Sequence, residues 1–188
     1  MKYHKSIALT GFMGSGKSLV GQELAKALSL PFYDLDQVIE SSEQRTVPRI
    51  FEESGEQHFR KLEQHYLMSL LNGPDAILAL GGGTLLDSDR VRLVRKHARL
   101  VYLRASVEVL LTRLRGDRDR PLLLDSAGRP LDNGQLAKKI KRLLEERDPV
   151  YLKSDLVLPV EEDSNLQSLI QQILRLLNDH AANRRIEY

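Results

Sequence analysis

Residues 6–28 read SIALTGFMGSGKSLVGQELAKAL, and the block in the middle decides the fold. That block, GFMGSGKS at 11–18, matches the pattern G-x-x-x-x-G-K-[ST] at every position. The short apolar run at 6–10 predicts a buried strand, and apolar residues at helical spacing predict a helix over 17–28. A strand, a glycine-rich loop and a helix in this order favour a Walker A phosphate loop, whose backbone N–H groups surround the phosphates of a nucleoside triphosphate.

Two side chains of this loop carry chemistry. Lys17 can reach the β- and γ-phosphates, and the hydroxyl of Ser18 is a ligand for Mg²⁺. The alternative is an ordinary glycine turn, but a full match in the required strand-to-helix context seldom arises by chance. We therefore expect the chain to bind a nucleoside triphosphate with magnesium.

The rest of the chain repeats the alternation of strand and helix. Apolar runs predict strands at 6–10, 30–33, 76–80, 99–103 and 156–160. Helical periodicity predicts helices at 17–28, 37–42, 47–53, 56–71, 88–96, 135–147 and 166–177, and one that Ser106 caps and that ends at Leu114. This alternation predicts a three-layer α/β/α fold with a five-stranded parallel sheet. Ligands of such sheets bind at the carboxyl ends of the strands.

The composition excludes several classes of protein. The net charge of +2 is too small, and the arginines too scattered, for a typical nucleic-acid binder. The absence of cysteine excludes disulfides and thiol catalysis. No apolar run reaches the roughly 20 residues that cross a bilayer. We expect a cytoplasmic, monomeric protein that works on small molecules, without a nucleic-acid or membrane partner.

Two carboxylates, Asp34 and Asp36, follow the second predicted strand. Residues two apart in an extended segment point the same way, so one carboxylate could serve the Mg²⁺ and the other an acceptor hydroxyl. The alternative is a helix N-cap followed by an acid in the first turn.

Other candidates lie beyond these carboxylates. Arg60 adjoins the apolar face of its helix and could bind a substrate carboxylate, with Glu63 orienting it, although it could also be a solvated arginine. Gly81, Gly82 and Gly83 follow the third strand. Three glycines here indicate a backbone that must approach a ligand closely, and the alternative is a plain turn.

The segment 116–134 lacks periodicity and contains Arg118, Arg120 and Arg129. A loop of this length in a compact domain is usually functional or disordered. A lid that closes over the nucleotide would bring a cation to the transferred phosphoryl group and exclude water. Arg113, just before the loop, could lie on the adenine.

The phosphate loop alone does not decide between classes. The chain lacks the N-K-x-D motif of GTPases, and its third strand ends in glycines where large ATPases carry a Walker B aspartate. These features favour a small-molecule kinase.

Six segments in order resemble the shikimate kinase family of P-loop proteins, from about residue 5 to about residue 178. They are GFMGSGKS at 11–18, FYDLD at 32–36, FRKLE at 59–63, LGGGT at 80–84, RPLL at 120–123 and ERDPVY at 146–151. The resemblance implies transfer of the γ-phosphate of ATP to the 3-hydroxyl of shikimate, a step toward chorismate and the aromatic amino acids.

The resemblance also implies a role for each site residue. Those expected to bind ATP are Gly14, Ser15, Gly16, Lys17, Ser18, Leu19, Arg113 and Arg120. Those expected to bind shikimate are Asp36, Arg60, Gly81, Gly82, Gly83 and Arg147. Lys17, Asp36 and Arg120 would be catalytic, and Ser18 and Asp34 would hold Mg²⁺.

We expect one domain over 1–178, with a shikimate-binding subdomain at about 34–62, a lid at about 116–134 and a polar tail at 179–188. Two alternatives remain open from the residues. One is another small-metabolite kinase, such as a gluconate kinase, and the other is a non-catalytic nucleotide-binding regulator.

Overall fold

The computed structural model describes residues 5–85, 88–117, 123–125 and 128–183, with side chains described up to residue 177. Its centre is a single sheet of five strands that pair in parallel, in the order β2-β3-β1-β4-β5. The strands are β1 (Ser6–Thr10), β2 (Phe32–Asp34), β3 (Ile77–Ala79), β4 (Ala98–Ala105) and β5 (Leu156–Val160). The predicted five-stranded parallel sheet is confirmed.

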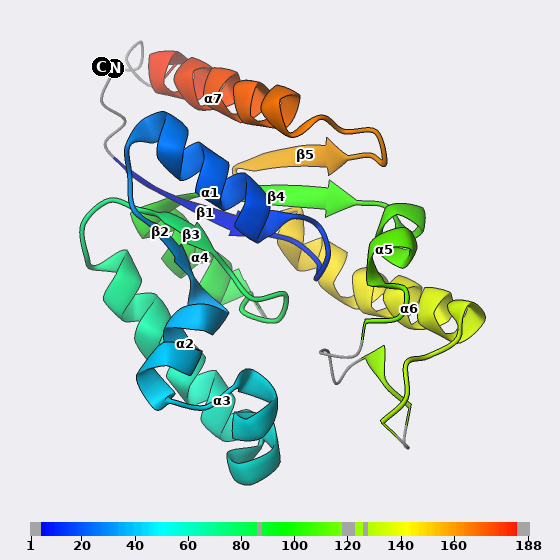
Figure 1. Cartoon of the computed structure of the whole chain (residues 1–188). Helices are drawn as coiled ribbons and strands as arrows, with labels where there is room; N and C mark the ends of the chain where they lie inside the picture. The colour runs from blue at the N-terminus through cyan, green and yellow to red at the C-terminus, as the bar shows by residue number, and fades with distance from the viewer. Residues whose placement is uncertain (1–4, 86–87, 118–122, 126–127, 184–188) are drawn as a thin grey trace.

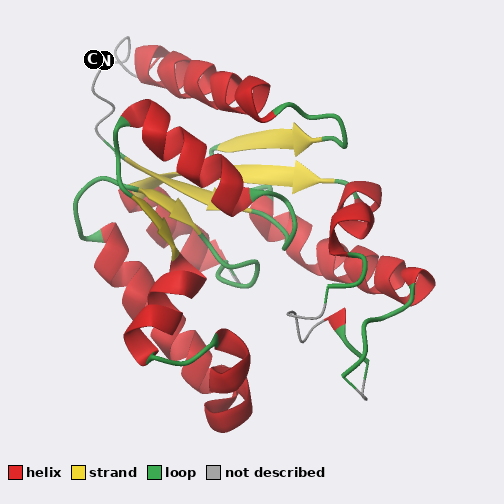
Figure 2. Cartoon of the chain, viewed as in Figure 1, coloured by secondary structure: helices red, strands yellow, loops and turns green. Residues whose placement is uncertain are grey.

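Helices cover both faces of this sheet (Figures 1 and 2). They are α1 (Lys17–Leu28), α2 (Leu35–Glu43), α3 (Val47–Leu71), α4 (Ser88–His97), α5 (Val107–Leu114), α6 (Asn133–Tyr151) and α7 (Leu166–Asn183). Figure 1 shows α1 in front of the sheet and α4 behind it. Each parallel strand therefore returns through a helix, as the alternating pattern predicts.

The hydrophobic core consists of two clusters, one on each face of the sheet. In β1, Ile7 and Leu9 belong to one cluster and Ala8 to the other, because successive strand side chains point to opposite faces. The first cluster contains residues of α1, α5, α6 and α7, and the second contains residues of α2, α3 and α4. This double burial explains why the strand sequences read as continuous apolar runs.

Three helices differ from the sequence-based prediction in ways that affect the site. Helix α2 begins at Leu35, two residues earlier than expected. The two helices predicted over 47–71 form one element with a break at Gly55 (φ 77°, ψ 169°). Helix α6 begins before the predicted residue 135 and continues past Pro149 to Tyr151, four residues beyond the predicted end.

The start of α6 also shortens the loop predicted at 116–134. Asp132 caps the helix, with its side chain accepting from the backbone N–H of Gln135 at 2.8 Å and the Gln135 side chain reaching back to the backbone of Asp132. This reciprocal capping box recruits residues 133 and 134 into the helix.

The topology fixes where a ligand can bind. Strand β1 lies between β3 and β4, so the loop after it emerges in the middle of the sheet's carboxyl edge. The segments that follow β2 and β3 emerge on one side of it at the same edge. Among the described residues, no helix is both long and apolar enough to cross a membrane.

Candidate functional site

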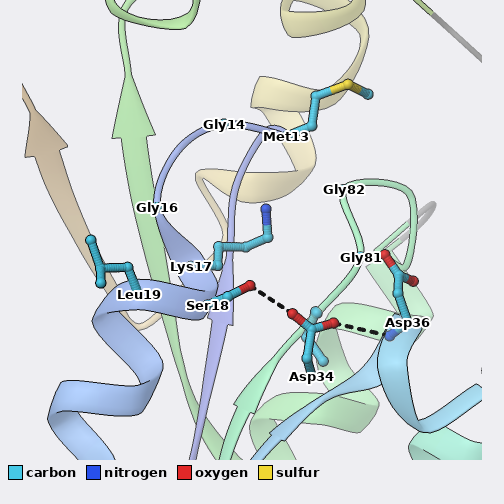
Figure 3. A pocket seen from close by; sticks show the side chains of 11 residues that line it. Met13, Gly14, Gly16, Lys17, Ser18, Leu19, Asp34, Asp36, Gly81 and Gly82 are labelled. Carbon is cyan, nitrogen blue, oxygen red and sulfur yellow. Dashed lines mark hydrogen bonds between the residues drawn. The ribbon is translucent and has the colours of Figure 1, made fainter. Parts of the chain in front are cut away.

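The phosphate loop, residues 11–18, curves from the end of β1 into the start of α1 (Figure 3). Gly16 occupies the N-cap position in the left-handed region (φ 96°), which an L side chain rarely adopts. No side chain caps this end of α1, and the positive end of the helix dipole lies at the phosphate loop. The site is built to receive an anion.

Lys17 holds the loop in shape from inside. Its Nζ donates to the backbone oxygens of Gly11 at 3.0 Å and of Phe12 at 2.9 Å. The ammonium group therefore already lies within the curve of the loop, beside the space that phosphates would fill.

Ser18 and Asp34 join α1 to the end of β2. The Ser18 hydroxyl donates to Asp34 Oδ2 at 2.6 Å, while Asp34 Oδ1 accepts from the backbone N–H of Asp36 at 3.2 Å. A hydroxyl and a carboxylate this close, on the wall of a cavity beside a phosphate loop, suit Mg²⁺. This ion is usually held by one or two protein oxygens together with phosphates and water.

Asp36 lies in the first turn of α2, not in an extended segment. The geometric reason given for pairing it with Asp34 is therefore wrong: Asp34 ends the strand and caps the helix, and the chain turns between them. The N-cap alternative describes the backbone correctly. Even so, both carboxylates line the same cavity, because the helix starts at the sheet's carboxyl edge.

The environment of Asp36 favours its neutral form. Burial, and then the negative charges of Asp34 and Glu63, raise the pKa of Asp36 from 3.8 to about 6, although Lys17 acts in the opposite direction. A carboxylate with a pKa near neutrality is suited to accept a proton.

Two cavities meet at Asp36. The phosphate-loop cavity, of about 260 Å³, is lined by residues 13–14, 16–19, 34, 36 and 80–82. The arginine cavity, of about 520 Å³, is lined by Arg60 and Arg147 together with an apolar wall of Val47, Pro48, Phe51 and Phe59 and with Glu40, Glu56, Glu63, Gly83 and Asp117. Met13, Asp36, Gly81 and Gly82 line both cavities.

Arg60 enters the arginine cavity from α3 and is not a solvated surface residue. Its side chain is 21% exposed, and its Nη1 lies 2.9 Å from Glu63 Oε2. Glu56, one turn earlier, contacts the Nη2 of Arg60 at 3.1 Å. The predicted orienting role of Glu63 has the geometry it needs, and Glu56 is a partner that sequence reasoning missed.

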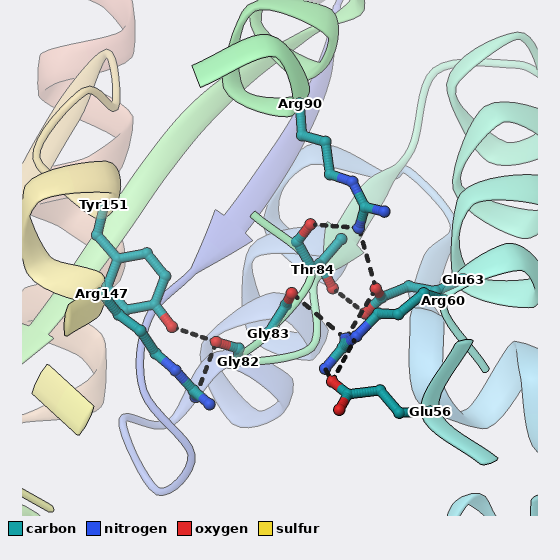
Figure 4. Close-up of polar contacts among 9 residues, drawn as sticks. All are labelled: Glu56, Arg60, Glu63, Gly82, Gly83, Thr84, Arg90, Arg147 and Tyr151. Carbon is teal, nitrogen blue, oxygen red and sulfur yellow. Dashed lines mark hydrogen bonds and ion pairs between the residues drawn. The ribbon is translucent and has the colours of Figure 1, made fainter. Parts of the chain in front are cut away.

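Gly82 and Gly83, in the glycine segment after β3, lie between the two arginines (Figure 4). Arg147 Nη1 donates to the Gly82 oxygen at 3.0 Å, and the Tyr151 hydroxyl donates to the same oxygen. A Cβ on Gly83 would lie 2.9 Å from Arg60 Nη2. Close approach of side chains to this backbone, rather than a plain turn, explains the absence of side chains here.

Arg147 also touches the phosphate loop. Its guanidinium carbon lies 5.6 Å from the centre of the Phe12 ring, a cation–π distance. Arg147 thus connects the phosphate loop to the glycine segment, and α6 must continue to Tyr151 for both donors to reach Gly82.

Of the other residues predicted to bind ATP, the structure places Arg113 and Leu19 at the phosphate loop. Arg113 donates to the Gly14 oxygen at 3.1 Å, and Leu19 lines the phosphate-loop cavity with 56% of its surface exposed. Arg118 and Arg120 lie outside the described residues. Arg129 pairs with Asp125 at 3.0 Å within the predicted lid.

Met13, Phe51 and Phe59 line the arginine cavity and Arg90 contacts Glu63, although none of the four was predicted as a site residue. An apolar side chain of a helix gives no sequence signal that it lines a cavity rather than the core. Arg90 contacts Glu63 from α4, 27 positions later in the chain, and no local pattern indicates such a contact.

Known proteins resemble this chain over nearly its whole length. Residues 13–178 match the family model described as shikimate kinase. The shikimate kinase of Chlorobaculum tepidum is 40% identical over 180 residues, which cover 96% of this chain and 94% of the relative.

Solved structures agree with this match. The structure of shikimate kinase from Acinetobacter baumannii in complex with shikimate is 32% identical, covers 95% of this chain and 96% of its own, and has a TM-score of 0.85. That of shikimate kinase from Bacteroides thetaiotaomicron is 30% identical, covers 94% of this chain and 99% of its own, and has a TM-score of 0.84. The chain belongs to the shikimate kinase family.

Proposed function

We propose that this protein is an ATP-dependent kinase that transfers the γ-phosphate of ATP to the 3-hydroxyl of shikimate, giving 3-phosphoshikimate and ADP. The product belongs to the route to chorismate and the aromatic amino acids. Membership of the family and the architecture of the site support the same reaction.

One observation carries the choice of acceptor. Arg60 and Arg147, from α3 and α6, line one cavity that shares Asp36 with the phosphate-loop cavity. Shikimate is a small ring with a carboxylate and several hydroxyls. A guanidinium pair suits the carboxylate, a carboxylate suits a hydroxyl, and the apolar wall suits the ring carbons.

The residues of this chain divide the chemistry between them. Arg60, Arg147 and the Gly81–Gly83 backbone hold shikimate so that its hydroxyl faces the phosphate loop. Asp36 accepts the hydrogen bond of that hydroxyl and takes up its proton during transfer. Lys17 stabilises the charge on the transferred group, with Gly14, Ser15 and Gly16 holding the phosphates.

Ser18 and Asp34 would hold Mg²⁺, since their oxygens lie 2.6 Å apart at the cavity wall. When bound, the ion neutralises charge on the phosphates. Arg113 and Leu19 adjoin the nucleotide on the other side, and Arg120, outside the described residues, would reach the phosphates from the lid.

Closure completes the proposal. We assign the shikimate-binding subdomain to about residues 34–62 and the lid to about 116–132, up to the start of α6, within one domain over 1–178. Both would move over the ligands and exclude water, which would otherwise compete with shikimate for the phosphoryl group.

A coupled assay of ADP release tests the function. With ATP and Mg²⁺, we expect turnover that depends on shikimate and that is far weaker with gluconate or quinate. Turnover with gluconate but not with shikimate would show that the acceptor is gluconate. Nucleotide binding without turnover of any of the three compounds would favour a non-catalytic regulator.

A further inference from the structure

A buried carboxylate, that of Glu63, lies in the wall of the arginine cavity. The Glu63 side chain is 1% exposed, and its two oxygens have contacts from its own helix α3, from α4 and from the loop after β3. Oε1 accepts from the Thr84 hydroxyl at 2.8 Å, and Oε2 lies 2.9 Å from Arg60 Nη1 and 3.3 Å from Arg90 Nη1 (Figure 4). Two guanidinium groups therefore share one carboxylate oxygen.

The need for a second guanidinium follows from electrostatics. A carboxylate buried away from water must be paired with a cation. The negative charge of the carboxylate then offsets the positive potential that this cation presents to a ligand in the cavity. With Glu63 alone, the charge of Arg60 would be largely cancelled, and Arg60 would have little attraction left for a substrate anion. A second cation on Glu63 restores that attraction, because Arg60, Arg90 and the buried Glu63 then sum to one positive charge. Glu56, the other carboxylate on Arg60, is 65% exposed, so water screens its charge.

Arg90 is placed to be this second cation without touching the substrate. It comes from α4, its side chain is 20% exposed, and its Nη1 also donates to the Thr84 backbone oxygen at 3.0 Å. Among the described residues, those lining the arginine cavity include Arg60 and Glu63 but not Arg90.

We propose that Arg90 is a positioning residue for the acceptor's carboxylate. It shares Glu63 with Arg60, so that Arg60 keeps both its place and its positive charge for the substrate anion. The proposal rests on the proposed function, in which that anion is the carboxylate of shikimate. Its effect belongs to acceptor binding and not to nucleotide binding or proton transfer.

The first test compares three variants of Arg90 with a control on the same helix. Arg90→Ala and Arg90→Gln should raise KM for shikimate about tenfold, the range expected for a charge-assisted contact. The kcat and KM for ATP should stay within about twofold of wild type. Arg90→Lys should recover most of the loss. Arg92, 75% exposed and paired with Asp89, is the control, and Arg92→Ala should change none of these values.

The second test separates charge from shape. The carboxamide of shikimate has the same outline without the anion, so wild type should bind it much more weakly than shikimate. Arg90→Ala should shrink this preference, because it weakens the charge that discriminates the two. If the Ala variant does not fold, Gln against Lys gives the same comparison at nearly constant size.

The outcomes remain distinct. An equal rise in KM for shikimate and the carboxamide would indicate a merely structural role and overturn the proposal, as would unchanged KM values in folded Ala and Gln variants. No turnover of shikimate by wild type would overturn the proposed function and this inference together.

Discussion

The two halves of the site are built in opposite ways. The nucleotide half is built around one contiguous octapeptide, residues 11–18, which works mainly through backbone N–H groups and a single lysine. The acceptor half is assembled from side chains of α2, α3 and α6 around the glycine segment after β3. A backbone loop fits any triphosphate, so the choice of substrate must reside in the dispersed half.

The largest effect is expected where the two halves meet. Asp36→Asn keeps the shape of the side chain but removes the proton acceptor, so kcat should fall by roughly 10²- to 10⁴-fold. ATP binding, measured by titration calorimetry, should persist because Lys17 and the phosphate loop are unchanged. Retained turnover in this variant would remove Asp36 from the reaction.

The acceptor half should fail separately from the nucleotide half. Arg60→Ala and Arg147→Ala should each raise KM for shikimate by about 10- to 100-fold, because each removes a charge-assisted contact, and KM for ATP should change little. Arg142 is a matched control on α6, 64% exposed and paired with Glu146. An equal loss in both KM values would show that the halves are not independent.

A smaller effect should come from the glycine segment. In Gly83→Ala the new Cβ would lie 2.9 Å from Arg60 Nη2 and displace the guanidinium. We expect KM for shikimate to rise about three- to tenfold, since small misplacements weaken binding. Gly73→Ala, whose Cβ would find its nearest neighbour at 3.4 Å, should leave steady-state kinetics unchanged. Equal kinetics for the two variants would contradict the close approach at Gly83.

The smallest effect concerns stability. The pKa of Asp36 is about 6 in the folded chain and 3.8 ordinarily, so the folded state binds the proton more tightly. Stability from this group is present below pH 4 and is lost as the pH rises to about 6. In the ligand-free protein at pH 7, Asp36→Asn should therefore raise the free energy of unfolding, by roughly 3 kcal/mol at most.

Denaturant titrations at several pH values measure this difference. It should disappear below pH 4, where both proteins carry a neutral side chain at residue 36. A difference that does not vary with pH would mean that the burial of Asp36 does not penalise its charge.

The contiguous half was predictable and the dispersed half only in part. The phosphate loop, α1 and the sheet follow from local patterns, and β1 and α1 have the predicted bounds. Asp36 was predicted as a site residue on a wrong geometric argument, which assumed that the strand continues past Asp34. In the structure Asp34 caps α2, and Asp36 lies in the first turn of that helix. Arg60 and Glu63 share one helix and could be paired from their spacing.

Contacts between distant elements had no such signal. The contact of Arg90 with Glu63 and that of Tyr151 with Gly82 depend on how α4 and α6 pack against the end of β3. The predicted helix over 135–147 ended before Pro149, because proline seldom continues a helix, and so it did not include Tyr151. In the structure α6 continues through Pro149 to Tyr151. Tertiary packing therefore determines both the contacts of Arg90 and Tyr151 and the length of α6.

A crystal structure of the protein with ADP, Mg²⁺ and shikimate is the most direct test of this two-part site. We predict that the carboxylate of shikimate lies between the guanidinium groups of Arg60 and Arg147, with a ring hydroxyl on Asp36 facing the phosphate loop. Shikimate bound elsewhere, or bound with its carboxylate toward Lys17, would contradict the account.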